Sequence, residues 1–249
     1  MRHQTHALTQ VSTLSALLNG IYDGEVTLSE LLTHGDFGIG TFDHLDGEMV
    51  VLDGRVYQVK DNGDVVQPNF SLTTPFAVVT KFEANEAHEL RRSMTFCRFE
   101  ADEDKRLPTK NIFHAIRIDG AFEKMTCRSV SRQEKPYPPL SEVAKKESIF
   151  EFKDVSGTLV GFRCPQYAAG INLPGYHLHF ISDDRTMGGH VLDFTIRSGV
   201  VKADYTPDFS MMLPEKGAFY LTDFEESCET KIGEIERGVP NEAKIVIHR

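Results

Sequence analysis

Three histidines lie close together in the C-terminal half of the chain, in the segment from Gly175 to His190. His177 and His179 are separated by one residue. Because side chains alternate between the two faces of a β-strand, both imidazoles are expected on one face. The turn-rich stretch 182–189 precedes His190 and a second apolar run, as expected for a strand that returns beside the first. The third imidazole should then lie next to the other two.

Three neutral imidazole nitrogens with a fourth position left open are the ligand set of a catalytic zinc site. A closed structural zinc site has four protein ligands, usually including Cys, and no Cys lies near these histidines. The alternative is that they are ordinary core or surface residues without a metal. The flanking residues Tyr176, Phe180 and Ile181 favour a buried strand, in which imidazoles need partners. The sequence therefore predicts a Zn²⁺ ion bound by the three histidines.

Composition indicates a soluble globular protein. The 249 residues suffice for one large domain or two small ones, and 40% hydrophobic with 26% charged residues is ordinary for such proteins. The net charge of −10 argues against a nucleic-acid partner, which would require clustered Lys and Arg. No segment resembles a membrane span or a signal peptide. Four scattered cysteines without a C-x-x-C pattern predict reduced thiols, so a cytoplasmic protein is expected.

Local patterns predict an α+β fold with mixed or antiparallel strands, flanking helices and two sheet-rich halves. Residues 1–12 are expected to be disordered, 13–135 to form an N-terminal α/β domain, and 136–249 a β-rich metal-binding domain with a terminal helix. The proline-rich stretch 134–140 is the predicted linker. Helices are expected over 14–21, 27–35, 87–99, 141–146 and 225–237, the first capped by Ser12-Thr13 and the second opened by a capping box from Thr27 to Glu30. Strands are expected over 47–52, 55–59, 76–82, 112–118, 121–130, 149–152, 158–162, 176–181, 191–196, 200–205 and 218–221. Asp53-Gly54 and Ser156-Gly157 are predicted turns between strands, and Gly120 is expected to separate two more.

Three distant residues could assist a metal in catalysis, which also needs an acid or base and a group that orients the substrate. Glu48 shares a strand face with apolar residues, and its own pattern favours the edge of a sheet over a buried functional carboxylate. Arg128 has a forked guanidinium suited to a carboxylate substrate, although the residue alone favours surface charge. Glu236 lies among other glutamates and by itself is most simply a solvated helix residue.

Three long motifs resemble those of the α-acetolactate decarboxylase family. Residues 35–58, GDFGIGTFDHLDGEMVVLDGRVYQ, resemble its N-terminal signature. Residues 128–140, RSVSRQEKPYPPL, resemble its central motif, and residues 176–193, YHLHFISDDRTMGGHVLD, resemble its metal motif. The resemblance covers nearly the whole chain after residue 12.

This resemblance implies the roles of several residues. The zinc ligands are His177, His179 and His190, the trio that the spacing also selects. The two active-site glutamates are Glu48 and, near the C-terminus, Glu236, with Glu234 as the fallback. Arg128 matches the substrate-facing arginine, and Thr41 falls where the family lines its pocket. The family also suggests a homodimer.

The implied reaction converts 2-acetolactate to acetoin and carbon dioxide. In this hypothesis the zinc ion is the electron sink for an enediolate intermediate, and no organic cofactor is required. Arg128 pairs with the substrate carboxylate or a developing oxyanion, while Glu48 and Glu236 transfer protons. The sequence leaves open which glutamate does which, the native divalent metal and the handling of enantiomers.

Two other functions remain as alternatives. A cupin-like metal oxygenase also begins its metal motif with His-x-His on a strand, but it usually adds a Glu a few residues later, where this chain has Ser182, Asp183 and Asp184. A zinc-stabilised binding module without enzymatic activity would require a closed coordination sphere. The count of three nitrogen ligands disfavours it.

Overall fold

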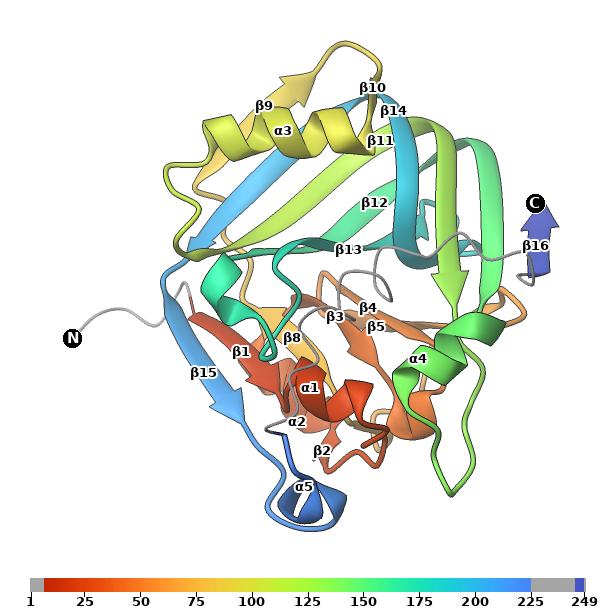
Figure 1. The fold of residues 1–249 in the computed structure, drawn as a ribbon. Coiled ribbons are helices and arrows are strands. Elements are labelled where there is room, and N and C mark those ends of the chain that lie inside the picture. The colour runs from red at the N-terminus through yellow and green to blue at the C-terminus, as the bar shows by residue number, and fades with distance from the viewer. Residues whose placement is uncertain (1–6, 225–244, 249) are drawn as a thin grey trace.

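Two seven-stranded β-sheets pack against each other and carry short helices at their margins (Figure 1). The computed structural model describes residues 7–224 and 245–248 of the chain. The predicted α+β class with mainly antiparallel pairing is confirmed. None of the described helices is both long and apolar enough to cross a lipid bilayer.

The first sheet contains, in spatial order, β15 (Asp208–Met212), β1 (Ala7–Val11), β8 (Ala77–Thr80), β3 (Phe37–Thr41), β4 (Glu48–Leu52), β5 (Arg55–Val59) and β6 (Val65–Val66). The second contains β10 (Met94–Thr95), β14 (Gly188–Thr206), β11 (Phe113–Ser129), β12 (Ser148–Cys164) and β13 (Gly175–Ser182) in that order, with β9 (Glu86–Leu90) paired to β14 and β16 (Ile245–His248) paired to β12. A small separate ladder joins β2 (Val26–Thr27) to β7 (Thr73–Thr74).

Helices are short and peripheral. They are α1 (Leu14–Leu18), α2 (Leu28–His34), α3 (Phe96–Arg106), α4 (Leu140–Val143) and α5 (Ala218–Leu221), with 3₁₀ turns η1 (Asp43–Leu45), η2 (Ala144–Lys146) and η3 (Gln166–Ala168). Figure 1 shows α3 across the second sheet, on the side away from the first sheet. The short helices α1 and α4 lie near the space between the sheets.

The second sheet closes on itself. Strand β13 pairs with β12 on one side and, through the hairpin to β14, with β14 on the other. Because β14 also pairs with β11 and β11 with β12, four long strands form a closed circuit of hydrogen bonds. Closure of this kind removes free edges and fixes the register of each strand.

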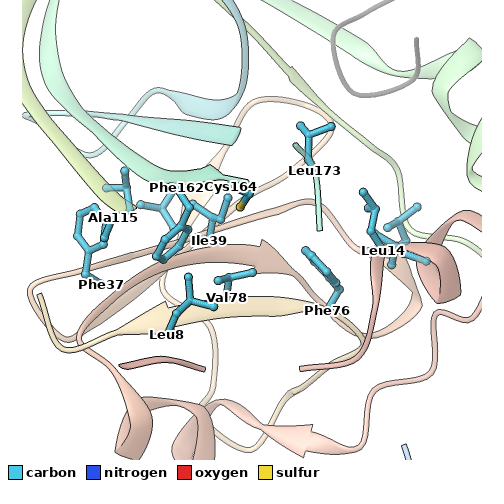
Figure 2. Close-up of a cluster of buried hydrophobic side chains, with 14 of the residues drawn as sticks. Leu8, Leu14, Phe37, Ile39, Phe76, Val78, Ala115, Phe162, Cys164 and Leu173 are labelled. Carbon is cyan, nitrogen blue, oxygen red and sulfur yellow. The ribbon is translucent and has the colours of Figure 1, made fainter. Parts of the chain in front are cut away.

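A shared hydrophobic core joins the two sheets (Figure 2). It includes Leu8, Ile39 and Val78 from the first sheet, and Ala115 and Phe162 from the second, all nearly inaccessible to solvent. Burial of this apolar area is the main stabilising contribution available to the interface. Two further clusters lie behind the sheets, one beneath α3 and one beneath α2.

The sheets do not divide the chain at the predicted boundary near residue 135. Strand β11, from the N-terminal side of that point, lies between β12 and β14 in the second sheet. Strand β15, from the C-terminal side, pairs with β1 in the first sheet. Residues 7–11, expected to be disordered, form β1, because parallel pairing with β15 and antiparallel pairing with β8 satisfy their backbone groups.

Local signals with a defined backbone requirement are confirmed. The side chain of Thr13 caps α1, and Thr27 Oγ1 accepts a hydrogen bond of 3.1 Å from the backbone N–H of Glu30 at the start of α2. Asp53 and Gly54 both have positive φ, 52° and 73°, as a two-residue hairpin turn between β4 and β5 requires.

Two predicted elements have the wrong type. The helix predicted over 87–99 is replaced by β9, β10 and the start of α3, because β9 pairs with β14 and alternates between partly buried and exposed side chains. The predicted strand 218–221 is α5. The predicted terminal helix 225–237 lies outside the described residues.

Two predicted turns are continuous strand. Gly120 does not separate two strands, and Ser156-Gly157 is not a turn, because these positions lie within β11 and β12. Gly120 pairs with Gly157 on one side and with Gly199 on the other. A Cβ on Gly157 would lie 2.4 Å from the carbonyl oxygen of Ile181, so these glycines permit close approach of neighbouring backbone.

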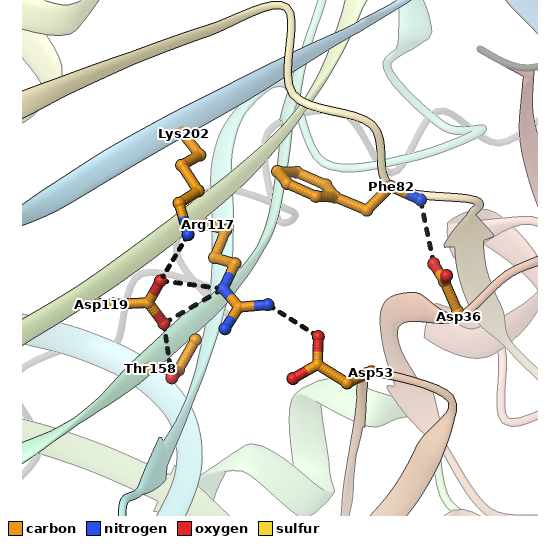
Figure 3. A network of polar contacts seen from close by, with 7 residues as sticks. All are labelled: Asp36, Asp53, Phe82, Arg117, Asp119, Thr158 and Lys202. Carbon is orange, nitrogen blue, oxygen red and sulfur yellow. Dashed lines mark hydrogen bonds and ion pairs between the residues drawn. The ribbon is translucent and has the colours of Figure 1, made fainter.

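A polar network ties the β4–β5 turn to the second sheet (Figure 3). Arg117 on β11 donates from Nη1 to Asp53 at 2.7 Å and from Nε to Asp119 at 3.0 Å. Asp119 also accepts from Thr158 at 3.0 Å and from Lys202 at 3.3 Å, which connects three strands of the sheet. The hairpin that carries Glu48 is therefore held in place at its far end.

Acidification should destabilise the fold through His114. This residue on β11 is fully buried, and burial, with Arg163 nearby, lowers its pKa from 6.5 to about 4. The unfolded chain takes up this proton at a higher pH than the folded one, so protonation favours unfolding below about pH 6.5. The contribution to the free energy of unfolding should fall by about 1.4 kcal/mol per pH unit between these pKa values. Urea titrations of wild type and His114→Phe at pH 7 and pH 5 measure this contribution. If acidification lowers the free energy of unfolding equally in both proteins, the prediction is contradicted.

Candidate functional site

The three histidines meet at one point between the sheets. His177 and His179 project from the same face of β13, and His190 of β14 is the register partner of His179. Ring centroids are 5.3 Å apart for His177–His179, 4.9 Å for His177–His190 and 5.3 Å for His179–His190. One ring nitrogen from each lies within 4.8 Å of the others. This convergence is the one that the His-x-His spacing and the returning strand predict.

Close packing of the backbone fixes the position of His177. On β12, Gly161 faces Leu178, and a Cβ at Gly161 would lie 2.0 Å from the carbonyl oxygen of His177. Any larger side chain there would push β13 away from β12. Gly189 has φ of 138° immediately before His190, a conformation that side-chain-bearing residues rarely adopt. These two glycines thus set the strand approach that brings the histidines together.

The imidazoles of His177 and His179 are neutral. All three residues are buried, and burial followed by the charge of Arg128 lowers the pKa of His177 to about 3. Burial and the neighbouring His177 hold the pKa of His179 well below its usual value. A neutral imidazole has one nitrogen lone pair available to a metal.

Hydrogen bonding selects which nitrogen of His179 faces the others. Its Nδ1 lies 2.8 Å from the backbone carbonyl of Met49 on β4, to which it donates. The lone pair is then on Nε2, which is buried and has no hydrogen-bond partner among residues 7–224. His177 Nδ1 is likewise buried and unsatisfied within that range. Buried nitrogens without partners, backed by a carbonyl that fixes the tautomer, are what a metal-binding imidazole requires.

The histidines line a cavity of about 400 Å³, a volume that includes its open mouth. Apolar side chains from α1, the first sheet and the segment leading into α4 form much of its wall: Leu14, Leu17, Leu45, Phe76, Val130 and Leu140. Thr41, Glu48 and Arg128 supply polar groups beside the histidines. The cavity therefore presents a few polar groups within an apolar enclosure.

Glu48 is in this cavity and not at a sheet edge. Strand β4 lies between β3 and β5, and Glu48 is only 7% exposed. Its Oε2 lies 3.6 Å from Nε2 of His179. The edge interpretation drawn from the residue alone is therefore wrong, because the second sheet covers the face on which Glu48 lies.

Arg128 is buried, which corrects the surface interpretation. On β11 it is the register partner of His190, and it is 3% exposed. Its Nη1 donates to Oε2 of Glu147 at 2.9 Å, and the Glu147 side chain is fully buried. A buried guanidinium beside a carboxylate has a fixed position and charge.

The remaining predicted site residues are Thr41 and the glutamate near the C-terminus. Thr41 is the register partner of Glu48, and its hydroxyl donates to the carbonyl of Gly47 at 2.7 Å, which holds the turn before β4. It lines the cavity as expected. Glu236 and its fallback Glu234 lie outside the described residues and stay predictions.

Sequence reasoning missed Glu147 and the apolar wall. Glu147 follows two lysines in a polar stretch, and nothing in that pattern indicates a buried partner for Arg128. Leu14 and Leu17 were placed on a helix by their spacing, but the spacing does not show what they face. The one local indication is that Glu147 immediately precedes the long strand β12, since a polar residue in such a position can be buried with it.

Loss of Glu147 should destabilise the fold strongly. Glu147→Ala would leave the Arg128 charge buried without this partner, at a cost of about 3–5 kcal/mol in the free energy of unfolding. The exposed Glu142→Ala is the matched control and should change it by less than about 0.5 kcal/mol. Urea unfolding measures both. Equal stabilities for the two variants would show that the ion pair contributes nothing.

Comparison with known proteins identifies the family of this chain. Residues 8–226 match the family described as Alpha-acetolactate decarboxylase. The alpha-acetolactate decarboxylase of Methanosarcina mazei is 49% identical over 92% of this chain and 80% of its own length, and that of Methylococcus capsulatus is 46% identical over 94% and 90%. The crystal structure of the Bacillus subtilis strain 168 enzyme superimposes with a TM-score of 0.91 at 40% identity, covering 94% of this chain and all of that one. The chain belongs to the alpha-acetolactate decarboxylase family.

Proposed function

We propose that this protein converts 2-acetolactate to acetoin and carbon dioxide, with Zn²⁺ bound by His177, His179 and His190. Membership of the family supports the reaction. The observation that supports the metal site is the convergence of three buried imidazoles on a cavity that also contains Glu48 and Arg128. The cupin-like oxygenase and the non-enzymatic binding module have no comparable support.

The residues present fit a zinc ion. Nε2 of His179 and Nδ1 of His177 are buried nitrogens unsatisfied by the described part of the chain, and the donor set is nitrogen-only. Zinc accepts imidazole ligands and commonly leaves a position for substrate when only three protein ligands bind it. When bound, zinc supplies a Lewis acid that accepts the electron pair released by decarboxylation.

Arg128 is assigned to the substrate carboxylate. Its guanidinium carries a permanent charge in a cavity with apolar walls, where an ionic hydrogen bond is stronger than in water. Glu147 offsets part of that charge and holds the guanidinium at one position. Because loss of carbon dioxide removes the carboxylate, pairing that is too tight would stabilise the ground state and slow the reaction. The neutralising contact with Glu147 moderates this.

The apolar wall keeps water from the reacting carbon. Leu14 and Leu17 face the cavity from α1, and Phe76 faces it from the position just before β8. Decarboxylation converts a charged group into neutral carbon dioxide, and an apolar surrounding favours the neutral product. Exclusion of water also reserves protonation for a positioned acid.

Glu48 is assigned to proton transfer. Its carboxylate oxygen lies beside His179 within the cavity, so it can hold a proton close to bound substrate. Reaction of the acetolactate anion requires one proton, which replaces the carboxylate on carbon and gives acetoin. Glu48 Oε2 can deliver that proton to one face of the planar carbon. The division of work with Glu236, the homodimer and the cytoplasmic location stay predictions.

Metal and activity should be lost together in a ligand variant. His179→Ala removes one of three nitrogens and should abolish both zinc binding at the histidine trio and acetoin formation. Elemental analysis and a colorimetric acetoin assay, each run with and without chelator, measure this. Acetoin formation at the normal rate by metal-free protein would contradict the proposed mechanism.

Glu48→Gln should separate metal binding from catalysis. The amide keeps the shape but cannot transfer the proton, so the rate should fall by about 10²-fold or more while zinc content is unchanged. Glu142→Gln, on the surface, is the control and should keep its rate. Turnover of Glu48→Gln close to that of the control would give Glu48 a structural role only.

A further inference from the structure

A second group of metal-ligating side chains lies on the outer face of the second sheet. Glu86 and His88 project from the same side of β9, and Glu103 projects from α3. One ligand atom from each of these residues lies within 4.8 Å of the others. His88 Nε2 and Glu103 Oε2 are 3.3 Å apart. Figure 1 shows β9 and α3 side by side.

The position of these three side chains follows from packing. Along β9 the residues alternate, so that Glu86, His88 and the buried Leu90 share the face turned toward α3. On α3, Glu103 is four residues from the buried Phe99 and thus lies on the same inward face. Surface charges would point the other way, as Glu89 does with 60% of its side chain exposed.

Three polar atoms of the group are buried without a hydrogen-bond partner in the described part of the chain. Glu103 is 2% exposed, and its Oε1 is buried with no hydrogen-bond partner in the described part of the chain. The same holds for Oε1 of Glu86 and for Nε2 of His88. An unpaired carboxylate oxygen in an apolar surrounding is costly, so such a site calls for a ligand.

The contact between His88 Nε2 and Glu103 Oε2 does not resolve this. It leaves Oε1 of Glu103 and Oε1 of Glu86 buried without a hydrogen-bond partner in the described part of the chain. Both carboxylates lie beside one imidazole, with a ligand atom of each residue within 4.8 Å of the others. A divalent cation would satisfy all three groups at once.

We propose that Glu86, His88 and Glu103 bind a divalent transition-metal ion of the zinc class, separate from the ion of the histidine trio. One imidazole nitrogen and two carboxylate oxygens are donors that such ions accept, with water completing the coordination. An open cavity lined by His88, Glu103 and Arg106 gives an ion access from solvent. The bound ion would link α3 to the edge strand β9, because its ligands come from both elements.

The inference is independent of the proposed catalytic function, and metal stoichiometry separates the two. Chelator-treated protein is titrated with Co²⁺, and bound ions per chain are counted by elemental analysis after dialysis. Wild type should bind two ions. His88→Ala should bind one and keep its acetoin formation, and His179→Ala should bind one and lose it. The double variant should bind none.

Two further variants complete the experiment. Glu103→Gln keeps the shape of the side chain, removes the charge and should bind one ion. It tests the site even if His88→Ala fails to fold. Glu89→Gln, on the exposed face of the same strand, is the matched control and should bind two. The proposal is overturned if wild type binds one ion and His88→Ala also binds one, or if wild type binds two and both His88→Ala and Glu103→Gln still bind two. If wild type and His179→Ala each bind one ion and His88→Ala binds none, the metal site at β9 is supported and metal binding by the histidine trio is contradicted.

Discussion

The register of the β13–β14 hairpin is the constraint on which the rest of the structure depends. It places His190 opposite His179 and so brings three imidazoles to one buried point. Because a slip of one residue would turn every side chain of a strand to the opposite face, this register has to be held firmly. The closed circuit of β11, β12, β13 and β14 provides that restraint, since no strand of it can slide without breaking hydrogen bonds on both sides.

The second sheet carries the three histidines, and the first sheet supplies further groups to the same site. Met49 accepts the Nδ1 proton of His179 through its carbonyl, and the adjacent Glu48 extends into the cavity from the same strand. The packing of one sheet on the other therefore decides the tautomer of a histidine as well as the position of the carboxylate. The hydrophobic core shown in Figure 2 supports both, because it fixes the distance between the sheets.

Buried charge is distributed unevenly over the second sheet. On its inner face, Arg128 and Glu147 form a pair whose charges offset each other. On its outer face, Glu86 and Glu103 lie together with His88. The first arrangement pairs its two charged groups directly, whereas the second leaves carboxylate oxygens buried without a hydrogen-bond partner in the described part of the chain. The same sheet thus carries two sites with different electrostatic requirements.

Local geometry was determined by the sequence itself. The His-x-His spacing, the Asp53-Gly54 turn and the Thr27 cap each follow from a backbone rule that acts within a few residues, and the motif resemblance added the place of Glu48 and Arg128 in the cavity. Only the tertiary structure decided that Arg128 has Glu147 as its buried partner, that Leu14 helps to close the cavity, and that the segment after residue 86 is a strand. The physical reason is that burial and strand pairing depend on segments distant in sequence, which a local pattern does not contain. Glu236 stays a prediction from resemblance, beyond the part of the chain that the structure describes.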